Sequence, residues 1–323
     1  MTAGAGQGER IAAAPADVGA EPFGARLAAR VQARRSQVVL GLDPDPARLW
    51  PEALESAPAG GSPRERAAAA VAAHCAALIS AAGPACVAAK PQVACFERLG
   101  APGWAALAAT VERARQAGLL VIADAKRGDI DVTARAYGQA FFGGAPTPFG
   151  AVDGLGVDAL TVNPYLGADA LAPLVDAARA AGGGLFVLVR TSNPGARDLQ
   201  DRRLEDGATV AEHVARLVDG LGGRREPLSD IGAVTGATVP EQLERLRELM
   251  PRTPFLLPGI GAQGGRAEDV AAAFAPGPAG GLVSASRSIA TAHEQTGGPP
   301  AEAARAEAER LRETAWSLAG AGL

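Results

Sequence analysis

Aromatic residues make up only 4% of this 323-residue sequence, although 48% of it is hydrophobic. A core built from such a chain must therefore consist mainly of Ala, Val and Leu side chains. The sequence has only three cysteines (Cys75, Cys86 and Cys95), which form no paired framework and no Cys-x-x-Cys motif. This scarcity argues against a disulfide-stapled fold and suits the reducing environment of the cytoplasm.

Features that mark other protein classes are also scarce. Three scattered histidines (His74, His213 and His293) cannot form a His-rich metal site, and we expect each of them on a helix surface. The net charge of −4 comes without a basic stripe, which argues against a nucleic-acid surface. No run approaches the roughly 18 unbroken apolar residues of a membrane span. The N-terminus lacks a signal-peptide pattern, and we expect residues 1–20, rich in Ala and Gly, to form a disordered tail.

Eight short apolar runs recur along the chain, separated by stretches rich in Ala, Leu, Arg and Glu. Each run is nearly continuous rather than alternating, as in parallel strands that are covered on both faces. The runs are Gln37–Asp43, Ala85–Lys90, Leu119–Asp124, Ala159–Asn163, Gly184–Arg190, Ile231–Gly236, Thr253–Pro258 and Gly281–Ser286. Eight strands that alternate with helices predict an α/β fold, a closed (β/α)₈ TIM barrel. A single domain of this kind can accommodate residues 21–323, which we expect to form the catalytic domain.

Helical stretches fill the spaces between the runs. The predicted helices are Ala67–Ala82, Gly103–Ala117, Gly167–Ala181, Thr209–Leu221, Pro240–Leu249 and Glu268–Phe274. Residues 44–63 and 142–156 are rich in Gly and Pro and are predicted to be loops. A doubly wound open sheet is the competing fold, but the Gly-x-Gly-x-x-Gly motif that usually follows its first strand is missing.

Polar residues cluster at the C-terminal ends of the predicted strands. They are Asp43, Lys90, Asp124 with Lys126, Asn163, and Arg190 followed by Thr191-Ser192-Asn193. In (β/α)₈ enzymes the active site occupies the face that these ends form. Because most of the strands agree, the pattern predicts an active site on that face.

Two loops predict a phosphate site on the same face. A glycine-rich segment, Gly259–Gly265, follows the seventh strand, and Ser286-Arg287-Ser288 follows the eighth. These loops are the usual phosphate position in this fold, where backbone N–H groups attract a dianion. Arg287 would add a charge-assisted contact. The position therefore favours a phosphate-binding loop over a plain turn, and a phosphate monoester as the substrate.

The densest motif is Asp124-Ala-Lys126-Arg127-Gly128-Asp129-Ile130, directly after an apolar run. Strand alternation would put Asp124 and Lys126 on one face, with Asp129 in the next turn and Lys90 on the neighbouring strand. A surface ion-pair cluster is the simpler alternative, but buried charges are tolerated only when they are paired. A protonated lysine between carboxylates is a general acid rather than a Schiff-base nucleophile, which needs a neutral amine. With no metal-ligand cluster, this predicts negative charge developing on carbon, as in decarboxylation or enolate chemistry.

These motifs resemble those of orotidine 5′-phosphate decarboxylases, in the subgroup typical of mycobacteria and other actinobacteria. The resemblance covers about residues 24 to 315, and its most specific part is Asp-x-Lys-Arg-x-Asp-Ile with a lysine on the preceding strand. The matching segments are Val39–Pro46, Lys90–Pro91, Asp124–Thr133, Thr161–Gly167, Val189–Ala196 and Pro258–Gly265.

The resemblance implies a homodimeric barrel, without metal or organic cofactor, that converts orotidine 5′-phosphate into uridine 5′-phosphate and carbon dioxide in pyrimidine biosynthesis. Lys126 would protonate C6 of the pyrimidine after carbon dioxide leaves, and Asp124 would lie beside the departing carboxylate. Lys90 and Asp43 would hold ribose hydroxyls.

Further contacts follow from the same resemblance. Asp129, Ile130 and Thr133 would reach into the active site of a second subunit. The remaining substrate contacts would come from Ser192 at the pyrimidine edge, Gln263 between base and phosphate, and Gly264, Ser286 and Arg287 at the phosphate. The sequence departs from shorter members of the family at Asn193, often a histidine, and in insertions around residues 44–63 and 197–230.

Two other functions remain open. A sugar-phosphate lyase of the same superfamily keeps an Asp-x-Lys-x-x-Asp string but uses magnesium, which would favour a carboxylate where Lys90 stands. A catalytically inactive barrel could merely bind a nucleotide. Such a binding protein has no need of a lysine between carboxylates, so the motif favours the enzyme.

Overall fold

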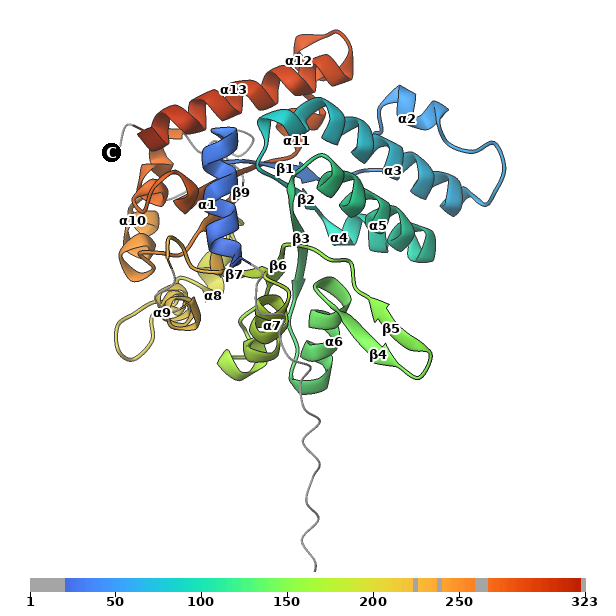
Figure 1. Cartoon of the computed structure of the whole chain (residues 1–323). Helices are drawn as coiled ribbons and strands as arrows, with labels where there is room; N and C mark the ends of the chain where they lie inside the picture. The colour runs from blue at the N-terminus through green and yellow to red at the C-terminus, as the bar shows by residue number, and fades with distance from the viewer. Residues whose placement is uncertain (1–20, 223–225, 237–239, 259–266, 321–323) are drawn as a thin grey trace, which may run out of the picture.

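The computed structural model describes residues 21–222, 226–236, 240–258 and 267–320. Its centre is a closed barrel of eight parallel strands in the order β1-β10-β9-β8-β7-β6-β3-β2 (Figure 1). The strands are β1 (Val38–Leu42), β2 (Ala88–Pro91), β3 (Leu120–Arg127), β6 (Ala159–Val162), β7 (Gly184–Arg190), β8 (Ile231–Thr235), β9 (Phe255–Pro258) and β10 (Gly281–Ala285). They confirm all eight predicted runs and the (β/α)₈ barrel. The tail expected for residues 1–20 lies outside the described residues.

Helices cover the outside of the barrel (Figure 1). Five predicted helices are present as α3 (Pro63–Ala82), α5 (Gly100–Gln116), α7 (Ala168–Ala180), α9 (Val210–Gly222) and α10 (Pro240–Leu249). The helix predicted at 268–274 is instead the 3₁₀ helix η2 (Ala267–Phe274). Elements that periodicity did not predict are α1 (Phe23–Arg34), α4 (Val93–Glu97), α6 (Asp131–Phe141), α8 (Ala196–Leu199), α11 (Arg287–Ala290), α12 (Ala292–Thr296), α13 (Pro300–Gly320), η1 (Gly83–Ala85) and η3 (Pro278–Gly280).

The two stretches predicted to be loops contain regular structure, so those predictions are wrong in part. Residues 142–156 include an antiparallel hairpin of β4 (Gly144–Thr147) and β5 (Gly150–Asp153). The Thr147 hydroxyl donates to the Gly150 carbonyl at 2.6 Å and closes the turn. Residues 44–63 include the short helix α2 (Pro51–Glu55). Gly and Pro mark turns, but they do not exclude short elements between the turns.

Helix α1 closes the N-terminal end of the barrel. Its Phe23 is fully buried and meets Phe186 of β7 edge to face, with ring centroids 6.0 Å apart. Arg34 donates hydrogen bonds to backbone carbonyls just before β2 and β3. Arg26 pairs with Asp158, just before β6, at 2.7 Å. Because these partners lie just before strands, α1 (blue in Figure 1) covers the N-terminal end of the barrel and leaves the C-terminal ends of the strands for a site.

Helix α3 is long and apolar enough, by length and composition, to cross a membrane. It packs against α5 and α13, however, and 56% of its most apolar window is buried inside the protein, as in a core helix.

His74 lies on the buried side of α3, so the expected surface position is wrong. Its Nδ1 accepts the backbone N–H of Trp50 at 3.2 Å. Burial, with His293 nearby, lowers the pKa of His74 to about 4, so the imidazole is neutral at pH 7.

The buried aromatic side chains give a test of the barrel interior. Phe186 is fully buried, and Phe186→Ala should lower the free energy of unfolding by about 3–5 kcal/mol because it opens a cavity. Phe149→Ala is the matched control, since Phe149 at the hairpin tip is fully exposed and should matter little. Urea denaturation of both variants checks this. Equal losses of stability in the two variants would show that Phe186 is not packed more tightly than Phe149.

Candidate active site

The predicted charge cluster lies where β2, β3 and β6 end, on the open face of the barrel. The Asp124 carboxylate accepts Lys90 Nζ at 2.7 Å on one oxygen and Lys126 Nζ at 2.5 Å on the other. The structure thus confirms that both lysines pair with this carboxylate. It is 10% exposed, so a surface ion-pair cluster is excluded as the explanation.

Two further donors complete the shell around Asp124. The Gln92 amide donates to the oxygen shared with Lys90 at 3.2 Å, and the Thr161 hydroxyl donates to the other oxygen at 3.0 Å. Neither residue was predicted to act on the cluster. A signal existed for Gln92, which stands two residues after Lys90 and therefore on the same face of the extended chain. Thr161 comes from β6, and only the strand register reveals its place.

The environment fixes the charge of the buried groups. Burial alone would raise the pKa of Asp124, but the two ammonium groups and their hydrogen bonds lower it to about 2. Burial likewise disfavours the charged form of Lys90, but the carboxylates of Asp124 and Asp43 outweigh it and raise the Lys90 pKa. Both groups are therefore ionised at neutral pH.

The two lysines differ in access. The Lys90 side chain is 8% exposed, whereas that of Lys126 is 46% exposed. Lys90 lies largely buried against Asp124, and Lys126 is the more accessible of the two, at the mouth of the barrel. The arrangement can therefore hold a fixed negative charge beside an accessible proton donor, which suits a reaction that develops and then protonates a carbanion.

Asp129 does not join this cluster within the chain. Its carboxylate accepts the backbone N–H of Ile130 at 2.8 Å, at the start of α6. Ile130 and Thr133 on the same segment are exposed, and the Ile130 side chain is 54% exposed. These three predicted residues therefore lie on one segment, from the end of β3 to the first turn of α6, where Ile130 and Thr133 are exposed.

Asp43, Ser286 and Arg287 lie together on another side of the mouth, after β1 and β10. They line one cavity of about 380 Å³. This agrees with the predicted neighbourhood of ribose and phosphate contacts. Gln263 and Gly264, also predicted to contact the phosphate, lie outside the described residues.

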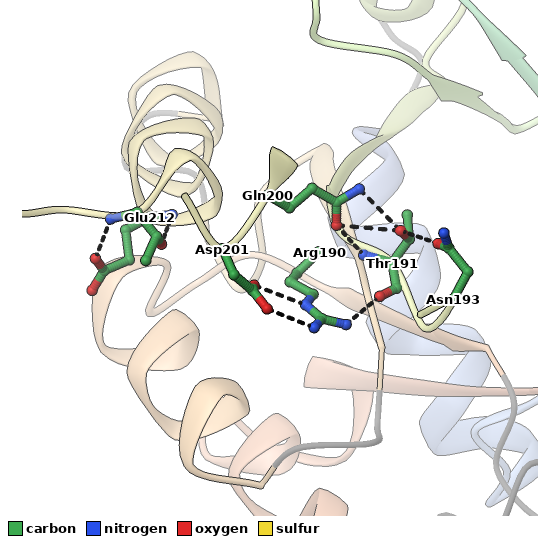
Figure 2. Close-up of polar contacts among 7 residues, drawn as sticks. Arg190, Thr191, Asn193, Gln200, Asp201 and Glu212 are labelled. Carbon is green, nitrogen blue, oxygen red and sulfur yellow. Dashed lines mark hydrogen bonds and ion pairs between the residues drawn. The ribbon is translucent and has the colours of Figure 1, made fainter. Parts of the chain in front are cut away.

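Ser192 lies in the loop after β7, which polar contacts hold in place (Figure 2). The buried Arg190 binds Asp201 through two hydrogen bonds, of 3.2 and 2.9 Å, and donates to the Thr191 carbonyl at 2.5 Å. Gln200 accepts the Thr191 backbone N–H at 2.8 Å. The hydrogen bond from Arg190 is the main cause of a lowered pKa at Asp201. Arg190, predicted among the polar strand ends, thus anchors the loop that presents Ser192 instead of facing the site.

Within the described ranges, no group of three or more His, Cys, Asp or Glu side chains could hold a metal ion. The fold and the site together define a (β/α)₈-barrel enzyme with a buried aspartate between two lysines at the C-terminal ends of its strands. The family model described as "Orotidine 5′-phosphate decarboxylase / HUMPS family" matches residues 36–306. The chain belongs to this family.

Individual relatives agree with the family model. The chain is 42% identical over 279 residues to an orotidine 5′-phosphate decarboxylase of Rhodopirellula baltica, covering 84% of this chain and 89% of that protein. It is 39% identical over 291 residues to the enzyme of the same name from Salinispora tropica, covering 90% and 96%. The structure of Leishmania donovani OMP decarboxylase superposes with a TM-score of 0.69 at 32% identity, covering 93% of this chain and 99% of that one.

The ionised cluster predicts a defined pH dependence of stability. Because the folded pKa of Asp124 is depressed, its contribution is fully present above the ordinary value of 3.8 and is lost as pH falls through about 2. The folded pKa of Lys90 is raised, so its contribution is present below the ordinary value of 10.5 and is lost as pH rises through the folded value.

Asp124→Ala should lower the stability of the protein and change its dependence on pH. Lys90 then stays buried without its main partner, and the free energy of unfolding should fall by about 3–5 kcal/mol near pH 7. The deficit should shrink towards alkaline pH, because the unpaired buried lysine loses its proton more readily than an exposed one. Urea denaturation at pH 7 and pH 9.5 measures both effects. Asp45→Ala is the control, since the Asp45 carboxylate is exposed and lies 3.8 Å from Arg98. If the stability deficit of Asp124→Ala is the same at both pH values, Lys90 is not the group that causes it.

Proposed function

We propose that the chain decarboxylates orotidine 5′-phosphate to uridine 5′-phosphate and carbon dioxide, the carboxy-lyase step of pyrimidine nucleotide biosynthesis. The observation that carries this function is the buried Asp124 carboxylate between a largely buried Lys90 and an accessible Lys126. Membership of the family and the names of the relatives support the same reaction.

In this mechanism the substrate carboxylate lies beside Asp124, whose charge the neighbouring lysines maintain. The bond between C6 and the carboxylate carbon breaks, its electron pair stays on C6, and carbon dioxide leaves. The Lys126 ammonium stabilises the carbanion and transfers a proton to C6, and water then restores the ammonium. Each tenfold gain in rate requires about 1.4 kcal/mol, so charges that are already in place before the reaction matter greatly.

The other contacts are assigned by position around the mouth. Lys90 and Asp43 would hold the ribose, Ser192 the pyrimidine edge, and Ser286 with Arg287 the phosphate. Arg287 is exposed on the cavity that Asp43 also lines, so its guanidinium is free to form a forked contact with a phosphate. Gln263, between base and phosphate, and Gly264, at the phosphate, complete the proposed set.

A homodimer would complete the site. The exposed start of α6 carries Asp129, Ile130 and Thr133, which would extend into the partner's active site. Val132, in the first turn of α6, and Tyr165, in the loop after β6, are 79% and 77% exposed, and such apolar surface favours burial against a second copy. We further propose a cytoplasmic enzyme without metal or organic cofactor, in line with its three free cysteines.

Activity without added metal is the primary test. Purified protein should convert orotidine 5′-phosphate into uridine 5′-phosphate with release of carbon dioxide, and the rate should be the same after treatment with EDTA. The reason is Lys90, which stands where a magnesium-dependent relative would favour a carboxylate ligand. Product analysis by chromatography measures the rate. Activity that EDTA abolishes and magnesium restores would favour the sugar-phosphate lyase, and nucleotide binding without turnover would favour the inactive barrel.

Subunit mixing tests the shared site. Homodimers of Lys126→Ala and of Asp129→Ala should each be nearly inactive, because every site lacks one of the two residues. A mixed dimer contains one site with both substitutions and one intact site, as the twofold symmetry of the contact requires. Exchange of subunits between the two variants should therefore restore activity. If exchange is verified and the mixture stays inactive, Asp129 serves its own subunit.

A further inference from the structure

The strand pairing beside the catalytic cluster is irregular. Ala123 of β3 pairs with Leu160 of β6, and Arg127 pairs with Val162, with a register shift between these two pairs. Three residues of β3, 124–126, therefore lie opposite the single residue Thr161. This is a β-bulge, and bulges are frequent next to active sites because they redirect side chains.

The bulge places Lys126 in an unusual backbone conformation. Its φ is 50°, in the left-handed region. This region is costly for residues other than glycine, and it persists only where the surroundings hold it. Lys126 and Asp124 therefore do not meet by simple strand alternation. The left-handed residue turns the Lys126 side chain back towards the carboxylate.

The Thr161 hydroxyl holds this conformation. The Lys126 backbone N–H donates to Thr161 Oγ1 at 2.9 Å, so a side-chain oxygen takes the place of a strand carbonyl as the acceptor. The same oxygen donates its hydrogen to Asp124 at 3.0 Å. Thr161 is only 1% exposed, so water does not compete for either bond. One hydroxyl thus ties the backbone of the proton donor to the carboxylate that its side chain binds.

We propose that Thr161 is a positioning residue for the proton transfer. It acts through Lys126 and Asp124, by holding the strained backbone that aims the ammonium and by orienting the carboxylate. The proposal rests on the proposed function, in which Lys126 protonates C6. Remote substrate contacts do not involve Thr161, so its loss should affect the chemical step far more than substrate binding.

Thr161→Val tests the proposal, since valine keeps the shape and removes the hydroxyl. The turnover number should fall on the order of 10- to 100-fold, as for a lost hydrogen bond to a charged group, while KM stays nearly constant. Thr161→Ser, which keeps the hydroxyl, should recover most of the turnover. A crystal structure of Thr161→Val should show that Lys126 has left the left-handed region.

Thr110→Val is the matched control. Thr110 is also buried, and its hydroxyl donates to the Ala106 carbonyl within α5, away from the site. Its turnover should match that of the wild type even if its stability falls. If Thr161→Val does not fold, Thr161→Ala serves instead, because it removes the same hydroxyl without placing a methyl group against the Asp124 carboxylate.

The outcomes separate two failures. Unchanged turnover in folded Thr161→Val, or a serine variant as slow as the valine variant, would overturn the positioning role. A rise in KM at unchanged turnover would overturn it as well, since it would place Thr161 in substrate binding. If the wild-type protein itself does not decarboxylate orotidine 5′-phosphate, the proposed function fails instead.

Discussion

A single buried carboxylate organises this active site. Asp124 must stay ionised in a pocket that excludes most water, and an uncompensated charge there would be strongly unfavourable. Four donors from three neighbouring strand segments, Lys90 with Gln92, Lys126 and Thr161, satisfy its two oxygens. The demand for these donors fixes how β2, β3 and β6 end. The Lys126 ammonium is thereby placed beside a permanent negative charge before any substrate arrives, and such prearranged charges need little reorganisation during a reaction.

The division of the barrel into a closed and an open end supports this arrangement. Helix α1 covers the N-terminal end, where Phe23 packs against Phe186, and the charged cluster lies at the opposite, C-terminal ends of the strands. The loop after β7 is held by Arg190 and Asp201, and the segment from β3 into the first turn of α6 exposes the apolar residues Ile130 and Val132. One segment is thus fixed by contacts within the chain, whereas the other leaves apolar side chains exposed.

Much of this could be predicted from the sequence. The eight strands were predictable because buried parallel strands are apolar on both faces, and the cluster was predictable because charges directly after such runs need partners. The bulge was not, because strand alternation also brings Asp124 and Lys126 to one face, and the pairing with Thr161 depends on a register that β6 sets. The hairpin β4–β5 was missed because its residues are few and largely exposed.

The position of α1 also has a consequence for how the chain folds during synthesis. Phe23 is made early, but its aromatic partner Phe186 and the ion pair of Arg26 with Asp158 come from far later in the chain. The N-terminal part of α1 therefore lacks these two contacts until β6 and β7 have been made. Contacts of such long sequence separation form late, and exposed apolar surface in the meantime invites association with other chains. The helix that covers the end of the finished barrel is thus a segment that needs protection from association with other chains while the barrel is being made.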